Sequence, residues 1–260
     1  MTEFPEAVQR QALHPFFELP QPATVKRFPL DGAVFTITPF PNAQMAFPTT
    51  VDTDVAALVE QTRAIAREHG KTAIAWWIAP EHDALAAAFE AEGVANKDTP
   101  GYEAVENAMA LVSEPRGERP VGVTVRPVES FADFRAGLDV NEQAFGLPPL
   151  PEDEKHQRYA EYLEQSEIGQ AYLACVDDQV AGAAYGAFGS AGLNLFGGAV
   201  LEEFRGRGIY RALTFARWDK AVERGTPALT VQAGKMSMPI LERLGFELVA
   251  AARVFVDDAF

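Results

Sequence analysis

The chain has 260 residues, a formal net charge of −15 and 48% hydrophobic residues. This length suits one large domain or two of medium size, and the apolar content supports a packed core and excludes long disorder. The acidic balance argues against nucleic acid or an anionic membrane surface as the main partner.

Compartment and metal content are also constrained by the sequence. Cys175 is the single cysteine, so no internal disulfide can form, which fits a reducing cytoplasm. The start "MTEFPEAVQR" lacks the basic and apolar parts of a signal peptide, and no apolar run is long enough to cross a bilayer. The four histidines show no metal-ligand spacing. We expect a cytoplasmic protein without a membrane association or a metal site.

The first half of the chain alternates strand and helix patterns. "DGAVFTITPF" predicts a turn and a strand. Apolar residues between Asp52 and Gly70 share a helical face, and Asp52 or Thr53 can cap its start. "TAIAWWIAP" predicts a buried strand that stops at Pro80, "EHDALAAAFEAEG" a helix that ends at Gly93, and "NAMALV" a further strand.

A composition break follows this half. "SEPRGERPVG", from Ser113 to Gly122, is rich in proline, glycine and charge, as is typical of a linker. The sequence therefore predicts one domain over residues 1–115, a linker over 116–121 and a second domain over 122–260.

The second domain begins with a strand, "VTVRPV". Ser130 and Asp133 then form a capping box before a helical pattern. "FGLPPLP" predicts a rigid loop, and a polar helix follows over about 152–165. "AYLACV" and "QVAGAAYGAF" predict a hairpin that turns at Asp177 and Asp178.

The remaining elements complete an order that the first half shares. "LNLFGGAVL" predicts a strand, and a helix follows that runs to Glu223. "ALTVQA" predicts a strand, "PILERL" a short helix, and "FELVAAARVFV" a final strand or strand pair. The common order indicates either a degenerate duplication or an unrelated α/β domain of similar order.

The stretch "EEFRGRGIYRAL" lies between the strand that ends near Leu201 and the helix that begins near Ile209. Its two glycines relieve the sharp turn, and they let an anion approach the free N–H groups and the positive dipole of the helix start. Its three arginines add positive potential. The stretch is either a cradle for a phosphate or pyrophosphate, or an ordinary turn with solvated arginines. The residues in question are Arg205, Gly206, Arg207, Gly208 and Arg211.

Two common phosphate motifs do not fit this stretch. The P-loop of NTPases needs Gly-Lys followed by Ser or Thr, and none is present. The dinucleotide fingerprint needs a third glycine three residues after Gly208, where this chain has Arg211.

The stretch instead resembles the acetyl-CoA loop of the GNAT superfamily of N-acetyltransferases. That loop reads Arg or Gln, two residues, Gly, one residue, then Gly or Ala, and Arg205–Tyr210 occupies the pattern after the strand "AVLEEF". "MPILERLGFE" is similar to the family's final helix and "GF" close, and the resemblance covers about residues 123–256. It implies an α/β fold (mixed α+β), with a twisted mixed sheet and helices on both faces, in two tandem GNAT-like domains.

The resemblance also implies where acetyl-CoA, the co-substrate, would bind. The strands that carry Val200 and Val231 would splay, with the pantetheine arm along Val200 and Leu201 and the pyrophosphate on the N–H groups of the loop. Gly197 and Gly198 indicate a bulge, which in this family helps to polarise the thioester carbonyl. Ser237 could assist the thiolate, or cap the helix that follows. The implied cofactor-binding residues are Gly198, Val200, Leu201, Arg205, Gly206, Arg207, Gly208, Ile209, Tyr210, Arg211 and Ser237.

Several positions depart from the family pattern. Tyr210 replaces the usual glycine or alanine, but its backbone donor remains. Gly234 falls where the family has asparagine. Leu241 falls where the family has the tyrosine that protonates the departing thiolate, and leucine cannot donate a proton. The strand from Leu193 to Val200 has no carboxylate to act as a base.

Two other side chains are therefore candidates for catalysis. Glu142, before the acceptor-side loop, could act as a base directly or through water, or be a solvated helix-end glutamate. Tyr185, on the hairpin, could face the cleft or be a core tyrosine. The C-terminal carboxylate of Phe260 is a further candidate.

These observations leave two functional classes. The first, which we expect because proximity and thioester reactivity supply much of the rate without a dedicated acid, is an enzyme that acetylates an amine of a small molecule or peptide by direct attack in a ternary complex. The second is an acyl-CoA-binding protein without turnover, which the missing tyrosine and strand carboxylate favour. We expect the first-half copy to bind no coenzyme A, because its junction, "FPNAQMAFPTTVDTD", has acids in place of glycines and arginines. We expect a monomer or homodimer.

Overall fold

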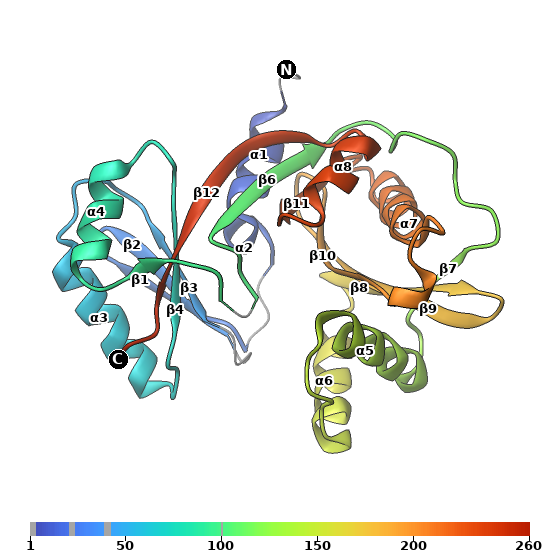
Figure 1. Cartoon of the computed structure of the whole chain (residues 1–260), viewed down its shortest axis with the longest axis horizontal. Helices are drawn as coiled ribbons and strands as arrows, with labels where there is room; N and C mark the ends of the chain where they lie inside the picture. Colours follow the sequence, from blue (N-terminus) through green and yellow to red (C-terminus); the bar gives the residue numbers. More distant parts are fainter. Residues whose placement is uncertain (1–3, 21–23, 39–42, 100) are drawn as a thin grey trace. The chain divides into compact units, whose positions relative to one another are not determined.

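The computed structural model describes residues 4–20, 24–38, 43–99 and 101–260, and the chain forms two compact units (Figure 1). The larger unit comprises Met1–Pro20, Met109–Gln232 and Ser237–Val249. The smaller unit comprises Gln21–Ala108, Ala233–Met236 and Ala250–Phe260. Each unit thus takes residues from both halves of the chain. That 1–115 and 122–260 behave as separate domains stays a prediction.

The larger unit is built on a mixed sheet. The strand order is β11-β10-β9-β8-β7, where β10 and β11 are parallel and the other neighbours antiparallel. Its strands are β7 (Thr124–Pro127), β8 (Gly169–Val176), β9 (Gln179–Phe188), β10 (Leu193–Val200) and β11 (Leu229–Ala233). Its helices are α1 (Glu6–Leu13), α2 (Pro15–Glu18), α5 (Phe131–Phe145), α6 (Glu152–Glu164), α7 (Ile209–Glu223) and α8 (Met238–Leu244).

Helices cover both faces of this sheet, as Figure 1 shows for α5 and α7. Neighbouring strand residues point to opposite faces, so the core divides in two. Leu173 and Ala183 pack with Val140 of α5. Ala184 packs with Ile209 on the α7 face. The predicted twisted mixed sheet with helices on both faces is confirmed.

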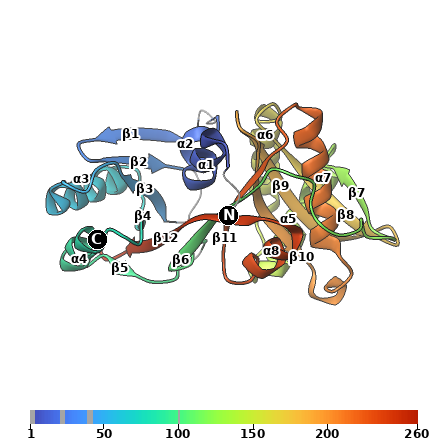
Figure 2. The ribbon, with the colours of Figure 1, turned by 90° about the horizontal axis from the view of Figure 1, so that it is seen from above.

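The smaller unit repeats part of this plan. Strands β1, β2 and β3 form an antiparallel run (Figure 2), β3 and β4 are parallel, and β12 is antiparallel to β4. Its strands are β1 (Lys26–Leu30), β2 (Ala33–Ile37), β3 (Gln44–Pro48), β4 (Ile74–Ile78) and β5 (Ala95–Asn96), with most of β6 (Val105–Leu111) and β12 (Glu247–Asp257). Its helices are α3 (Val55–Glu68) and α4 (Asp83–Ala91), and both pack on one core with Trp76 and Phe255.

Both units therefore contain a strand, a helix and a second parallel strand in the same order, β3-α3-β4 and β10-α7-β11. The strand predicted over 31–40 is β2, and its last two residues lie outside the described part of the chain. The strand that leads into α3 is β3, within a stretch that the sequence analysis treated as a junction.

Local chemistry explains the ends of the predicted helices. The backbone N–H of Asp133 donates to Ser130 Oγ at 3.1 Å, so the predicted cap of α5 is confirmed. The helix predicted from Asp52 begins at Val55 instead, because Asp54 accepts from the N–H of Ala57 at 3.0 Å.

Over the described residues, none of the helices is long and apolar enough to cross a membrane.

Candidate functional site

The parallel strands β10 and β11 pair only at their beginnings. Leu193 lies opposite Leu229 and Asn194 opposite Thr230, whereas β10 continues to Val200. The register of β10 against β9 shifts between Phe196 and Ala199, and Gly197 in this bulge has φ +53°. The strands thus separate where the sequence predicted a splay, and the bulge lies in the unpaired part of β10.

The loop after β10 leads into a helix start that no side chain caps. Gly206 and Gly208 have φ values of +79° and +81°, which only glycine adopts without strain. Gly208 is the N-cap of α7 and has no side chain to offer. Among the described residues, nothing accepts a hydrogen bond from the backbone N–H groups of 206–211. Free N–H groups and the helix dipole make this end a favourable place for an anion.

Three arginines surround this helix start without carboxylate partners. Within the described ranges, Arg205, Arg207 and Arg211 form no ion pair, although the chain carries a net charge of −15. The guanidinium of Arg207 lies 5.4 Å from the centre of the Phe204 ring. The Nε of Arg211 is buried and has no hydrogen-bond partner. These guanidinium groups are therefore not engaged by a carboxylate at ion-pair distance, although Glu202 and Glu203 precede them in the chain.

The other predicted cofactor residues lie around the same strand and helix. The N–H of Leu201 donates to the carbonyl of Ala181 at 3.0 Å, and Val200, the last residue of β10, is half-buried against the core on the α7 face. Ile209 is buried in the α7 core. The Tyr210 ring lies against Gly198, where an added Cβ would come within 2.8 Å of it, and burial raises the pKa of this tyrosine.

Ser237 and Leu241, two of the remaining positions discussed in the sequence analysis, lie at the start of α8 and inside it. Ser237 occupies the N-cap position of α8 but makes no side-chain capping bond. Leu241 is fully buried in α8. Its position supplies no proton donor. Among the described residues, no group of three or more His, Cys, Asp or Glu side chains could hold a metal ion.

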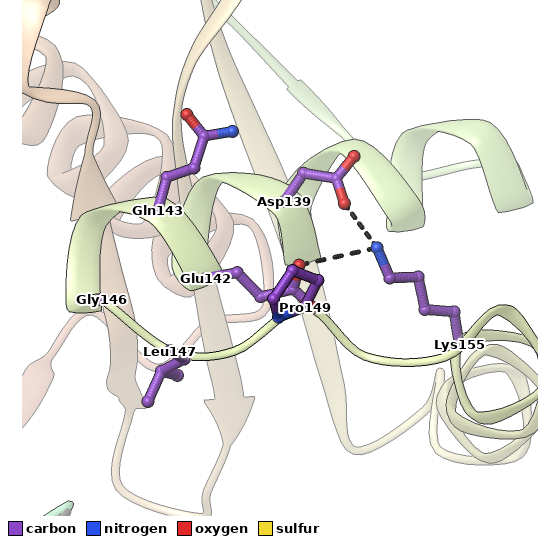
Figure 3. Close-up of a pocket in the computed structure, with 7 residues that line it drawn as sticks. All are labelled: Asp139, Glu142, Gln143, Gly146, Leu147, Pro149 and Lys155. Carbon is purple, nitrogen blue, oxygen red and sulfur yellow. Dashed lines mark hydrogen bonds and ion pairs between the residues drawn. The ribbon is translucent and has the colours of Figure 1, made fainter.

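Glu142 is engaged in holding a loop. Its Oε1 accepts from the N–H of Leu150 at 2.9 Å, and its Oε2 lies 3.6 Å from the ammonium of Lys155, which also contacts Asp139 at 2.6 Å (Figure 3). The carboxylate is 8% exposed, so it is not the solvated helix-end group considered above. It lines a pocket of about 490 Å³ with Asp139, Gln143, Gly146, Leu147, Pro149 and Lys155. A function as base stays a prediction.

Tyr185 lies beside the bulge. It is paired opposite Phe196, the last residue before the register shift, and the two ring centres are 6.5 Å apart. Burial raises the pKa of Tyr185 to about 12. The phenol is therefore protonated near neutral pH, and burial makes it a weaker proton donor than an ordinary tyrosine. Its catalytic function stays a prediction.

A buried polar chain, which the sequence analysis missed, lies where β10 and β11 begin to separate. Gln11 of α1 accepts from the N–H of Ala191 at 3.2 Å and donates to Gly192 at 3.1 Å, which fixes the orientation of its amide. It also donates to Thr230 Oγ1 at 3.0 Å, which in turn donates to Asn194 Oδ1 at 2.8 Å. This leaves Asn194 Nδ2 as a buried donor without a partner.

A second unpaired atom lies two residues further along β11. Gln232 donates from Nε2 to the carbonyl of Ala12 at 2.7 Å, and its Oε1 is buried without a partner. The signal was visible as single polar residues inside "LNLF" and "LTVQA", two otherwise apolar strand patterns. Such residues need partners when they are buried.

Comparisons with known proteins agree with this geometry. No protein-family model matches the chain, and no curated protein matches its sequence. A GCN5-related N-acetyltransferase from Kribbella flavida superposes with a TM-score of 0.71 at 18% identity, covering 97% of this chain and 96% of that one. One from Sphaerobacter thermophilus gives 0.65 at 18% identity, covering 87% and 80%.

A tandem GNAT protein from the clavulanic acid biosynthesis pathway also matches, with a TM-score of 0.62 at 15% identity, covering 100% of this chain and 90% of that protein. The chain thus has the fold of the GCN5-related N-acetyltransferases, as the sequence predicted.

Proposed function

We propose that this chain, which has the fold of the GCN5-related N-acetyltransferases, transfers an acetyl group from acetyl-CoA to an amine of a small molecule or peptide. One observation carries the proposal. The uncapped start of α7 and its unpaired arginines directly follow a bulged strand whose end is not paired to its parallel neighbour. These features together offer a phosphate site beside a gap for a thioester arm.

Different groups of the chain would bind different parts of acetyl-CoA. The N–H groups of 206–211 would hold the pyrophosphate, with Arg205 and Arg207 adding charge. The free edge of β10 at Val200 would pair with the pantetheine arm. The acetyl group would then lie near the bulge at Gly197, where strand amides turn away from the ladder.

The neutral amine would attack the thioester carbonyl carbon directly in a ternary complex. The C–N bond would form as the C–S bond breaks, coenzyme A would leave as the thiolate, and the proton lost by the amine nitrogen would end on the thiolate sulfur. Proximity supplies much of the rate when two substrates are held together. Tyr185, protonated near neutral pH, can donate a proton. Glu142 is held by Leu150 and Lys155 and would need to exchange those partners to act as a base.

A second candidate is an acyl-CoA-binding protein without turnover. The buried Leu241 favours it, because no proton donor stands at that position to assist the departing thiolate. In either case we propose a cytoplasmic monomer or homodimer with no membrane or nucleic-acid partner.

The test combines ligand binding with turnover. Acetyl-CoA at about a hundred times its dissociation constant should stabilise the folded state by roughly 2.7 kcal/mol, seen as a rise in melting temperature. Thiol release from acetyl-CoA should then increase with some members of a panel of amines. Binding without turnover on any amine would favour the second candidate. Absence of binding would reject both.

A further inference from the structure

The segment Arg116–Pro120, here called the strap, lies within the stretch expected to be a linker, yet it contacts the end of α8. The N–H of Arg116 donates to the carbonyl of Leu244, the last residue of that helix, at 2.8 Å. Gly245 follows with φ +97°, and a Cβ there would come within 3.1 Å of the Arg116 side chain. The strap is thus attached to α8 by its main chain.

The same segment also contacts the start of α7. A Cβ on Gly208 would come within 2.9 Å of Pro120 Cγ, and one on Gly117 within 3.5 Å of Arg211 Nη1. Arg211 Nη2 lies 3.4 Å from the Cβ position of Gly208. The guanidinium of Arg211 therefore lies close to both the strap and the N-cap of α7, with its Nε buried and unpartnered.

Arg119 fastens the strap further along α7. It donates to both carboxylate oxygens of Asp219, at 2.6 and 2.7 Å, and to Glu114 at 3.2 Å. Its guanidinium lies 4.6 Å from the centre of the Phe215 ring. Hydrogen bonding to Asp219 raises the pKa of Arg119, so its guanidinium stays charged. Figure 1 shows this part of the chain, in green, running outside α7 toward β7.

We propose that the strap is a part of the acetyl-CoA site: it holds the start of α7 against the end of α8 and presents Arg211 to a phosphate of the ligand. Arg119 is the positioning residue, because it fixes the strap through Asp219 and acts on the ligand only through Arg211. The inference rests on the function proposed above and adds a binding element to it.

Two physical arguments support the strap over a passive linker. A flexible linker needs no fixed contacts, whereas this segment has a main-chain bond, a bidentate ion pair and two close glycine contacts within five residues. Moreover, a cation that is held in place before binding costs less to order when its anion arrives. The strap lies against Arg211, since the Cβ position of Gly117 is 3.5 Å from its Nη1, and among the described residues no carboxylate has to be displaced before this cation meets a phosphate.

The experiment measures acetyl-CoA affinity by calorimetry in the wild type and four variants. Arg119→Gln and Asp219→Asn should each weaken binding by about five- to tenfold, and the exchange Arg119→Asp with Asp219→Arg should recover most of it. The matched control is Arg126→Gln, which breaks the 2.6 Å pair with Asp133 in the same unit and should change affinity by less than about twofold. Urea unfolding of each variant shows whether the fold is kept.

A double-mutant cycle separates positioning from general support. If Arg119 acts through Arg211, then Arg119→Gln should have little further effect, less than about twofold, in an Arg211→Gln background. Two outcomes would overturn the proposed function of the strap while leaving the acetyl-CoA site intact. One is that the losses of affinity in Arg119→Gln and Arg211→Gln add up in the double variant, and the other is that a folded Arg119→Gln protein binds acetyl-CoA as tightly as the wild type. Failure of the unaltered protein to bind acetyl-CoA would instead reject the proposed function, and the strap with it.

Discussion

The two strand-to-helix junctions of this chain differ in how the N–H groups of the helix start are satisfied. Before α3, the Asp54 carboxylate accepts from the N–H of Ala57 at 3.0 Å, so part of the helix start is already paired. Before α7, Gly208 leaves the corresponding groups open. The two junctions have the same topology, so the difference between them lies in the chemistry of a few residues rather than in the fold.

The strands around these junctions differ in the same direction. Strand β3 is paired with β4 from Gln44 to Ala46, which is most of its length. Strand β10 is paired with β11 only at Leu193 and Asn194 and continues unpaired to Val200. On its β11 side, strand β10 therefore has backbone groups without a strand partner, next to the uncapped start of α7. In the smaller unit, by contrast, more backbone groups are satisfied internally.

The largest expected effect on acetyl-CoA affinity comes from placing a side chain at the uncapped start of α7, here called the open junction. Gly208→Asp puts a Cβ within 2.9 Å of Pro120 at φ +81° and adds a carboxylate where phosphate must approach. We expect acetyl-CoA affinity to fall by more than about a hundredfold, so that no ligand-induced rise in melting temperature is seen.

Arg207→Ala is the matched comparison for this variant. Arg207 is exposed and its removal leaves the backbone donors in place, so the loss should be about 1 kcal/mol of binding free energy. The melting temperature of each variant without ligand shows whether aspartate has damaged the turn. A folded Gly208→Asp protein with the full ligand shift would mean that the open junction is not the phosphate site.

The next effect should appear in stability alone. Arg63 in α3 holds the fully buried Asp257 of β12 by hydrogen bonds of 2.8 and 3.0 Å. Arg63→Met leaves that carboxylate buried and unpaired, which should cost about 3 kcal/mol of unfolding free energy. Because the pair lies in the smaller unit, acetyl-CoA affinity of the folded variant should match that of the wild type. A parallel loss of affinity would show that the smaller unit takes part in binding.

Much of this contrast could be predicted from the sequence, because it depends on local residues. The glycine and arginine pattern after β10, the absence of that pattern before α3, and the Ser130 cap are short-range signals. The bulge was also predictable, since adjacent glycines inside an apolar strand pattern indicate one.

The long-range arrangement could not be predicted in this way. The final strand pattern gives no sign that β12 pairs with β4, or that Gln11 of α1 completes a polar chain with Thr230 and Asn194. The pairing of β12 with β4 and the contact of Gln11 with Thr230 join residues more than a hundred positions apart. A fragment that begins near residue 120 would lack α1 and therefore the hydrogen bond from Gln11 to Thr230. Point variants keep this contact, so they test the two junctions more cleanly than fragments do.

A pH experiment examines the smaller unit further. Glu106 accepts from Trp77 Nε1 at 2.9 Å, and burial, with a contribution from the charge of Glu103, raises its pKa from 4.5 to about 7. The folded state thus holds a proton more tightly than the unfolded state. The stability that this provides is complete below pH 4.5 and is lost as pH rises to about 7.

Glu106→Gln should remove this dependence. Relative to the wild type, the variant should gain up to about 3 kcal/mol of unfolding free energy between pH 4.5 and pH 7, measured by urea unfolding at several pH values. Acetyl-CoA affinity should be the same in both proteins at each pH. Identical stability profiles for the two proteins would show that Glu106 titrates normally.

The smallest expected effect comes from removing the side-chain cap at the start of α3. Asp54→Ala removes the cap of α3 and frees the N–H of Ala57, so the larger unit's open helix start is imitated in the smaller one. Loss of an N-cap carboxylate typically costs about 1 kcal/mol of stability. The junction would still lack the glycine pair, the arginines and a separated strand edge, so no second molecule of acetyl-CoA should bind. Calorimetry should therefore give the wild-type stoichiometry and affinity together with a lower melting temperature. A second binding event in Asp54→Ala would mean that the cap alone kept the smaller unit from binding, and that the remaining differences between the junctions are not needed to explain their division of function.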